Sequence, residues 1–198
     1  MRKASIDRNT TETSIGGVVN LDGVGNYFIK TSIPFLDHML EQFSRHSMID
    51  LEITVNGDLQ IDAHHTAEDS ALAIGQAINK ALGNRIGICR YGSALLPMDE
   101  TLSRVVIDLS NRPYLIWKVC FSRDKLGTMD SELFKEWFYS FAQALGATIH
   151  VETLYGENNH HIAESCFKAL AIALHDAITI YDRNVNIIPS TKGTLTEI

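Results

Sequence analysis

The chain has few of the features that mark secreted, membrane-bound or disulfide-stabilised proteins. Its three cysteines, Cys89, Cys120 and Cys166, form no Cys-x-x-Cys pair, and their odd number does not suit a disulfide framework. We expect free thiols in a reducing compartment and therefore a cytoplasmic protein. No apolar run approaches the ~20 residues that cross a bilayer, and the N-terminus lacks the apolar stretch of a secretion signal. We expect no membrane association.

The chain also has no excess of positive charge. The 24 acidic residues outnumber the 17 lysines and arginines, which gives a formal net charge of -7, and the chain contains no basic run. A general nucleic-acid binder needs a basic surface, so we expect no nucleic-acid partner. The length of 198 residues and the hydrophobic content of 45% are sufficient for one large domain, residues 1–198.

An internal repeat divides the sequence. Two pairs of segments match in the same order, 12–21 with 100–109 and 51–57 with 149–156. We therefore expect two repeat halves, about 1–88 and 89–198. No linker rich in proline or serine separates them, so the halves should pack closely.

Each half shows strand patterns, a helix, another strand and a second helix. The earlier helix is predicted at 35–43 in the first half and at 133–141 in the second. Apolar residues at helical spacing predict the later helix of each half, after His64 and after His160. This order predicts an α+β fold, an internally duplicated domain in which each half packs a sheet against two helices.

Two matching histidine clusters open the later helices, HHTAE at 64–68 and HHIAE at 160–164. Residues three and four apart share a helix face. Each glutamate therefore sits beside one of its two histidines, and the other histidine points elsewhere. Imidazole and carboxylate groups together suit a first-row divalent metal ion. One such cluster could equally be a solvated helix N-terminus, where glutamate is favoured by the dipole, but two in matching contexts favour metal binding.

The repeat also predicts how each metal site is assembled. Aligning the earlier helices places His38 opposite Glu136. Each site can then draw on that residue, a His–Glu pair from one cluster and a histidine from the other, which leaves open positions typical of catalytic metal sites. The predicted ligands are His38, His64, His65, Glu68, Glu136, His160, His161 and Glu164.

A series of motifs along almost the whole chain resembles the imidazoleglycerol-phosphate dehydratase family. The motifs are RNTTET (8–13), FLDHML (35–40), HHTAED (64–69), RYG (90–92), PMDE (97–100), NRP (111–113), NHH (159–161), FKA (167–169) and PSTKG (189–193). The chain departs from the family pattern at Asn111, at Thr191 and at Glu136, where many members carry a metal-binding histidine.

The resemblance implies a fold of the ribosomal protein S5 domain 2 type and an activity. A dehydratase of this family removes water from imidazole-glycerol phosphate to give imidazole-acetol phosphate in histidine biosynthesis. The resemblance further implies two Mn²⁺ ions per subunit. It also implies a homo-oligomer of twenty-four subunits with active sites at the subunit contacts.

The resemblance also assigns roles to individual residues. Glu12 is expected to act as the acid/base, and Glu164 is expected to be catalytic as well as a ligand. The substrate phosphate calls for cationic donors. The residues expected to bind substrate are Glu12, Gln42, His46, Arg90, Arg112, Lys168, Ser190, Thr191 and Lys192.

Two rival functions fit parts of the pattern. A dinuclear metallohydrolase would also use paired metals to activate water, but the chain lacks the HExxH spacing of zincins. A ferritin-like metal store or a metal-stapled shell would use Glu-x-x-His on long bundle helices, which a strand-rich chain does not offer. Comparing dehydration with phosphate-ester hydrolysis tests the first rival, and binding of triazole mimics of imidazole tests the second.

Overall fold

The structure, a computed structural model, describes residues 1–183 and 185–195. Its first half contains β1 (Lys3–Asn9), β2 (Thr13–Asn20), β3 (Tyr27–Lys30), α1 (Pro34–Ser47), β4 (Asp50–Gly57) and α2 (His64–Leu82). Its second half contains β5 (Tyr91–Met98), β6 (Thr101–Asp108), β7 (Tyr114–Lys118), β8 (Lys125–Leu126), β9 (Met129–Asp130), α3 (Glu132–Leu145), β10 (Thr148–Tyr155) and α4 (Asn159–Ile178). Apart from the short β8–β9 hairpin, the halves have the same order of elements.

The two four-stranded sheets have the same topology. Their strand orders are β1-β2-β4-β3 and β5-β6-β10-β7. All neighbours are antiparallel except β3–β4 and β7–β10, which are parallel. A parallel pair needs a crossover connection, and α1 and α3 lie in these two connections. The predicted α+β duplication, with a sheet and two helices in each half, is confirmed.

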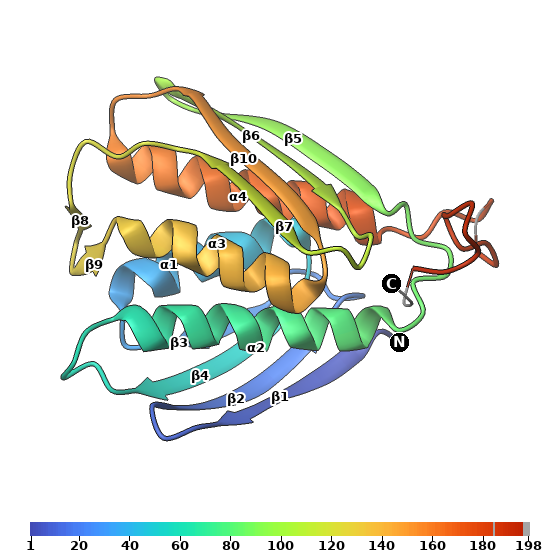
Figure 1. Cartoon of the computed structure of the whole chain (residues 1–198), viewed down its shortest axis with the longest axis horizontal. Coiled ribbons are helices and arrows are strands. Elements are labelled where there is room, and N and C mark those ends of the chain that lie inside the picture. The colour runs from blue at the N-terminus through green and yellow to red at the C-terminus, as the bar shows by residue number, and fades with distance from the viewer. Residues whose placement is uncertain (184, 196–198) are drawn as a thin grey trace.

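The four long helices lie between the two sheets (Figure 1). Across the boundary between the halves, α1 packs against α4 and α2 packs against α3. Gly75 permits the close approach of α2 to α3, because a Cβ atom there would lie 2.8 Å from Cβ of Ala144 and 2.9 Å from the carbonyl oxygen of Phe141. This packing allows helices from different halves to contribute side chains to one site.

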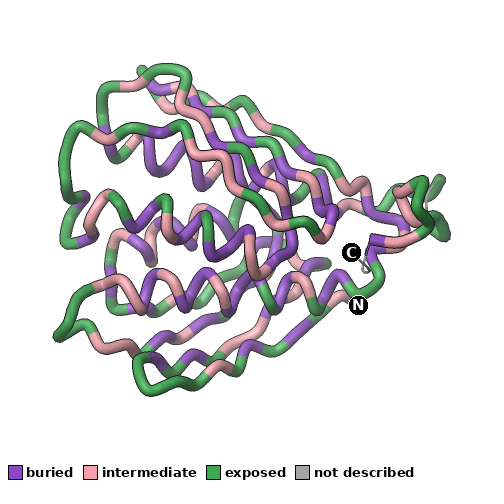
Figure 2. Tube along the Cα trace, viewed as in Figure 1, coloured by how far each residue is buried: buried purple, intermediate pink, exposed green. Residues whose placement is uncertain are grey.

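The centre of the helix layer is aromatic. Trp137, Phe138 and Phe141 of α3 pack against Phe43 of α1 and Phe167 of α4, and all five side chains are 0% exposed. Burial of each large apolar side chain stabilises the fold by about 1.5–3 kcal/mol. Figure 2 shows this burial along the helices and the inward strand positions. The core therefore fixes the helices that carry the histidine clusters.

The chain after α4 returns to the junction between the halves. The amide of Gly87 donates to the carbonyl of Ile187, and the amide of Cys89 to that of Thr179, both at 2.9 Å. In Figure 1 this segment lies beside the end of α2, at the end of the molecule that also holds the N-terminus. No helix within the described ranges is long and apolar enough to cross a membrane.

Arg85 is buried at the same junction. Its guanidinium donates to the carbonyl oxygens of Leu109 (2.8 Å) and Leu145 (2.9 Å) and to the side chain of Asn79 (2.8 Å). Burial lowers the pKa of the group. Leu145 is the last residue of α3, where a positive charge is favourable. Arg85 therefore links the segment after α2 to the second half.

Candidate active site

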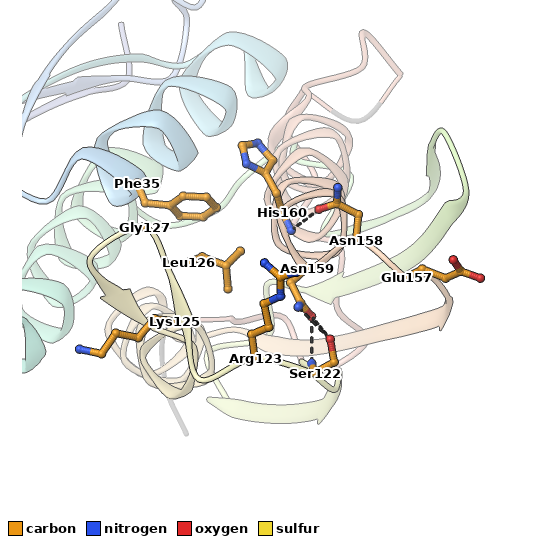
Figure 3. Close-up of a pocket in the computed structure, with 10 residues that line it drawn as sticks. All are labelled: Phe35, Ser122, Arg123, Lys125, Leu126, Gly127, Glu157, Asn158, Asn159 and His160. Carbon is orange, nitrogen blue, oxygen red and sulfur yellow. Dashed lines mark hydrogen bonds between the residues drawn. The ribbon is translucent and has the colours of Figure 1, made fainter.

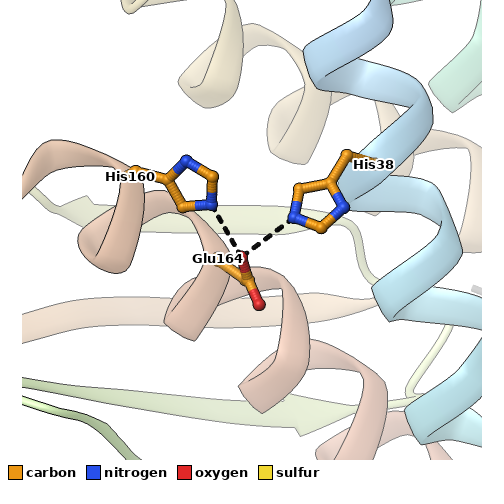
Figure 4. A group of neighbouring side chains, drawn as sticks. All are labelled: His38, His160 and Glu164. Carbon is orange, nitrogen blue, oxygen red and sulfur yellow. Dashed lines mark hydrogen bonds and ion pairs between the residues drawn. The ribbon is translucent and has the colours of Figure 1, made fainter.

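The first candidate metal cluster joins helices from the two halves. His38 lies on α1, and His160 and Glu164 lie one turn apart on α4 (Figure 4). The Nε2 atoms of His38 and His160 lie 3.1 and 2.9 Å from the same oxygen, Oε2 of Glu164. The ring of Phe35 packs edge-on against His160, with centroids 5.1 Å apart. The three polar side chains converge as ligands of one cation would.

Glu164 is the electrostatic centre of this cluster. Its side chain is 7% exposed, and its Oε1 lies 2.5 Å from Nζ of Lys168. Burial alone raises the pKa of the carboxyl group. The hydrogen bonds from Lys168, His160 and His38 outweigh burial and lower the pKa to about 2. Glu164 is therefore ionised at neutral pH and holds a negative charge between the two imidazoles.

The second candidate metal cluster is the counterpart of the first in the repeat. His64 and Glu68 lie one turn apart on α2, and Glu136 reaches them from α3. The Nε2 atom of His64 lies 3.5 Å from Oε2 of Glu68. The Ser140 hydroxyl donates to Glu136 at 3.4 Å. As in the first cluster, one half supplies the His–Glu pair and the other half supplies the third residue.

Both donor sets fit a divalent transition-metal ion. In each cluster, one ligand atom from every residue lies within 4.8 Å of the others, so small side-chain movements would bring all three within bonds of about 2.0–2.2 Å to a common ion. Three ligands leave positions open in the shell of a manganese-type ion. Six of the eight predicted ligands are thus brought together in two groups. The partner of each glutamate is the first histidine of its doublet.

The second histidine of each doublet points away from its cluster. His65 Nδ1 lies 2.9 Å from Oδ2 of Asp58, and its Nε2 lies 3.7 Å from Oε1 of Glu12. His161 Nδ1 lies 2.7 Å from Oε2 of Glu100. The hydrogen bond to Asp58 raises the pKa of His65, and the hydrogen bond from His161 lowers the pKa of Glu100. The sequence did not reveal Asp58, which belongs to no motif named above.

Glu12 lies in the turn between β1 and β2, beside the start of α2. Its side chain is 49% exposed, and it faces the ring of His65. The other predicted catalytic carboxylate, Glu164, is buried in the first cluster. The two carboxylates therefore differ in setting, since Glu12 is open to an incoming molecule and Glu164 is already surrounded by cationic and imidazole groups.

Arg90 and Arg112 lie together beside the C-terminal segment. Arg90 donates to both carboxylate oxygens of Asp108, at 2.7 and 3.2 Å, and to the carbonyl of Pro189 at 2.9 Å. Arg112 Nη2 lies 3.7 Å from Asp108 Oδ2, and its side chain is 54% exposed. The chain continues directly from Pro189 into the predicted phosphate-binding residues Ser190, Thr191 and Lys192. These basic and hydroxyl groups share one end of the molecule.

The remaining predicted substrate residues extend from the first cluster along α1 and α4, and His46 lies at the end of α1, where the carbonyl of the next residue accepts a hydrogen bond from His175 of α4. Lys168 forms the ion pair with Glu164 and is therefore separate from Arg90 in this chain. Burial, followed by the charge of Lys168, lowers the pKa of His46. Gln42 lies on α1 one turn after His38 and one turn before His46. The predicted site residues thus form a metal-type group and a phosphate-type group.

These two groups lie at opposite ends of α4. His160 is near its first residue, and the backbone amide of Arg90 donates to the carbonyl of Ala177 near its last. At ~1.5 Å per residue, the distance between His160 and Ala177 is ~25 Å. Figure 1 shows the same separation, with the start of α4 far from the junction segment.

A cavity of about 530 Å³ opens beside His160 (Figure 3). Arg123 and Lys125 line it together with the apolar side chain of Leu126. Asn159 anchors this loop, because its Nδ2 donates to Oγ of Ser122 and its Oδ1 accepts from the Ser122 amide, both at 2.9 Å. No sequence motif marked Arg123 or Lys125, which the fold alone brings near the first cluster.

Comparison with known proteins gives the chemistry of the chain. It matches the family model of imidazoleglycerol-phosphate dehydratase over residues 31–174. The imidazoleglycerol-phosphate dehydratase of Zymomonas mobilis is 58% identical over 194 residues, which are 98% of this chain and 99% of the relative. The crystal structure of the Staphylococcus aureus enzyme is 36% identical with a TM-score of 0.82, over 90% of this chain and 99% of that one. The Pyrococcus furiosus enzyme is 37% identical with a TM-score of 0.77, over 95% and 99%.

The shared fold and these matches define a hydro-lyase, an enzyme that removes water by breaking a carbon–oxygen bond. The chain belongs to the imidazoleglycerol-phosphate dehydratase family. It dehydrates imidazole-glycerol phosphate to imidazole-acetol phosphate, a step of histidine biosynthesis. The family assignment sets aside the metallohydrolase and metal-store hypotheses.

Proposed function

We propose that this dehydration depends on two divalent metal ions per chain, one at each cluster. The observation that carries the proposal is the repetition of the cluster itself. Two helix pairs related by the duplication each bring three imidazole or carboxylate groups within 4.8 Å. Manganese is the proposed ion, because carboxylate ligands suit it and because the sequence resembles a manganese-dependent family.

The residues of the chain divide the chemical work in this proposal. The proton that leaves the substrate lies on a carbon with no adjacent carbonyl, so its removal needs a positioned base. Glu12 is the proposed base, and general acid–base catalysis typically contributes ~10²–10⁴-fold. Bound ions would supply Lewis acidity and would orient the imidazole ring and the departing hydroxyl group. Glu164, with its low pKa, keeps its charge available for the ion in the first cluster.

The phosphate end is held by the other group of residues. Arg112 is half exposed, and its guanidinium lies within ion-pair distance of Asp108. Arg90 uses three of its five N–H donors on Asp108 and Pro189 and retains two for an anion. With Lys192 and the hydroxyls of Ser190 and Thr191, these donors would fix the phosphate and reduce the entropy cost of aligning the ring.

We further propose that each active site is completed by a second copy of the chain, within a homo-oligomer of twenty-four subunits. Only a glycerol backbone separates the ring from the phosphate in the substrate, whereas ~25 Å of helix separates His160 from the position of Arg90. One chain therefore does not offer both groups to one substrate molecule. The outward histidines, His65 and His161, supply ligands for a neighbouring cluster in this arrangement.

Metal content and particle size, measured with and without a chelator, test the proposal. The expected result is two ions per chain, with loss of turnover and of the large assembly when the ions are removed. Restoring activity with Mn²⁺ would separate metal loss from unfolding. A chain that keeps full turnover and its size in the presence of chelator contradicts the proposal. A cytoplasmic location is also proposed, supported by the three cysteines, which form no disulfide.

A further inference from the structure

Each half uses one carboxylate to hold the second histidine of its doublet. The Nδ1 atom of His65 lies 2.9 Å from Asp58, and that of His161 lies 2.7 Å from Glu100. An ionised carboxylate can only accept hydrogen bonds. The Nδ1 atom of each ring therefore carries the hydrogen, and the lone pair of the neutral ring is on Nε2.

The Nε2 atoms of both rings lie beside exposed carboxylates, and the histidine side chains are themselves 30% (His65) and 23% (His161) exposed. For His65, the nearest carboxylate is that of Glu12 at 3.7 Å, and its side chain is 49% exposed. For His161, it is that of Asp99 at 3.8 Å, and its side chain is 83% exposed. Both distances exceed that of a hydrogen bond. Each ring is thus held at Nδ1 and presents Nε2 outward.

The two holding carboxylates come from different positions of the repeat. Glu100 lies in the turn between β5 and β6, where the first half has Glu12 between β1 and β2. Asp58 directly follows β4, where the second half has Glu157 after the end of β10. The first half therefore uses the acid after its last strand, and the second half uses the acid of its first hairpin.

Because the two halves hold their histidines with carboxylates from different positions, the carboxylate that does not hold the second histidine is also different, Glu12 in the first half and Glu157 in the second. Glu100 is fully engaged, because it accepts hydrogen bonds from His161, from the Thr101 hydroxyl (2.9 Å) and from the Asn158 amide (2.8 Å). Glu12 has no such set of donors among the described residues, since Asp58 takes the Nδ1 hydrogen. In the second half, Glu157 lines the cavity beside His160, and its carboxylate points away from the His160 ring (Figure 3).

We propose that Asp58 and Glu100 are positioning residues, which fix the outward histidines in the Nδ1–H form and so present Nε2 to an ion held by another copy of the chain. By taking this role in the first half, Asp58 also leaves Glu12 free for the substrate. The inference rests on the proposed metal dependence and on the proposed assembly. A carboxylate behind a ligand histidine usually contributes 10–100-fold to metal affinity.

The first test measures the tautomer of each ring directly. Metal-free protein labelled with ¹⁵N-histidine is examined by NMR at a pH high enough that the ring signals no longer change with pH, with His65→Gln and His161→Gln used for assignment. Both rings should carry the hydrogen on Nδ1. The Nε2–H form should appear for His65 in Asp58→Ala and for His161 in Glu100→Ala. Unchanged Nδ1–H signals in these variants would overturn the proposal.

The second test measures Mn²⁺ affinity and particle size of the same variants. Asp58→Ala and Glu100→Ala should each weaken Mn²⁺ binding by about 10–100-fold and shift the assembly toward smaller particles. Glu157→Ala is the matched control, because it removes the repeat counterpart of Asp58, and it should leave both measurements unchanged. Asp58→Asn and Glu100→Gln should recover part of the affinity, because an amide oxygen still accepts from Nδ1.

The two tests separate this proposal from the metal proposal beneath it. If wild-type protein binds no Mn²⁺, metal dependence fails, whereas the tautomers of the metal-free rings still report on Asp58 and Glu100. If wild-type protein binds Mn²⁺ and the alanine variants bind it equally well, the positioning role is wrong and metal dependence stands. Circular dichroism of each variant shows that a lowered affinity does not come from unfolding.

Discussion

The two candidate metal clusters occupy equivalent places in the repeat but differ in ligands and exposure. The first combines two imidazoles with Glu164, whose side chain is 7% exposed. The second combines one imidazole with Glu68 and Glu136, and the Glu68 side chain is 36% exposed. With neutral histidines, the second ligand set carries one more negative charge than the first. Lys168 pairs with Glu164 and offsets the charge of the first cluster further.

This difference shows which features the duplication has kept. Both clusters take a His–Glu pair from the last helix of one half and a third residue from the earlier helix of the other half. The packing of helices across the boundary fixes these positions. The equivalent positions of α1 and α3 carry His38 and Glu136, and this single difference changes the charge of the site without moving it. The backbone is symmetric, and the chemistry is not.

The largest expected effect comes from comparing the two glutamates at equivalent turns of the repeat, Glu12 between β1 and β2 and Glu100 between β5 and β6. Glu12→Gln should lower kcat by ~10²–10⁴-fold, because it removes the proposed proton-transferring group, while the content of bound metal stays the same. Glu100→Gln should lower kcat by less than about tenfold, because the amide oxygen still accepts from His161. Steady-state kinetics with metal analysis of each variant checks both. Full turnover by Glu12→Gln with metal bound would show that another group moves the proton.

A comparison of the segments that follow α2 and α4 gives the next largest effect. Arg85 after α2 is 1% exposed and donates to four acceptors, the carbonyls of Leu109, Leu145 and Gly146 and the side chain of Asn79, whereas Arg183 after α4 is exposed. Arg85→Met leaves buried acceptors without a partner, at a cost of about 3 kcal/mol in the free energy of unfolding. Arg183→Met should cost close to nothing. Denaturant unfolding of the metal-free variants measures both, and equal values would contradict the role given to Arg85.

The sequence predicted much of this comparison, because its strongest signals are local. Helical spacing predicted the four long helices and the pairing of each glutamate with a histidine of its doublet. The repeat predicted two sheets of the same kind and placed His38 opposite Glu136. All of these depend on neighbours within a helix or on repetition along the chain.

Contacts between distant segments were not predicted. The hydrogen bond between His38 and Glu164 joins residues in different halves, and no pattern along the chain indicates which half supplies the third ligand. Asp58 was missed, because its contact with His65 depends on the shape of the loop between β4 and α2. The burial of Arg85 was missed for a related reason. An arginine is usually exposed, and only the meeting of three segments supplies its acceptors.

A smaller effect is expected from making the two clusters alike. Glu136→His gives the second cluster two imidazoles and one carboxylate, as in the first. The change should shift its preference from Mn²⁺ toward Zn²⁺ by about tenfold, since imidazole suits zinc and carboxylate suits manganese. Equilibrium dialysis with both metals, on wild type and variant, measures the preference. Ser140→Ala is the control, because it removes only the hydroxyl next to Glu136. If Glu136→His has the same preference between Mn²⁺ and Zn²⁺ as wild type, residue 136 is not a ligand.

The smallest effect concerns acid stability of the last strand in each half. Asp50 starts β4 and accepts hydrogen bonds from the Val24 and Asn26 amides, at 3.0 and 2.9 Å, whereas Thr148 starts β10 with an uncharged hydroxyl that donates to a carbonyl. Burial raises the pKa of Asp50, but these hydrogen bonds outweigh it and lower the pKa below its ordinary value. The stabilisation is therefore complete at neutral pH and is lost as the pH falls from about 5 through the ordinary aspartate pKa of about 3.9 and on toward the lowered value.

The free energy of unfolding of Asp50→Asn should accordingly fall less between neutral and acid pH than that of wild type, because an amide does not titrate in this range. Thr148→Val removes the corresponding hydrogen bond in the second half and should lower stability by a similar amount at every pH. Denaturant titrations of the metal-free proteins across the pH range measure the two slopes. Because Thr148 does not titrate, the difference between the slopes isolates the charge that only the first half uses to hold its last strand.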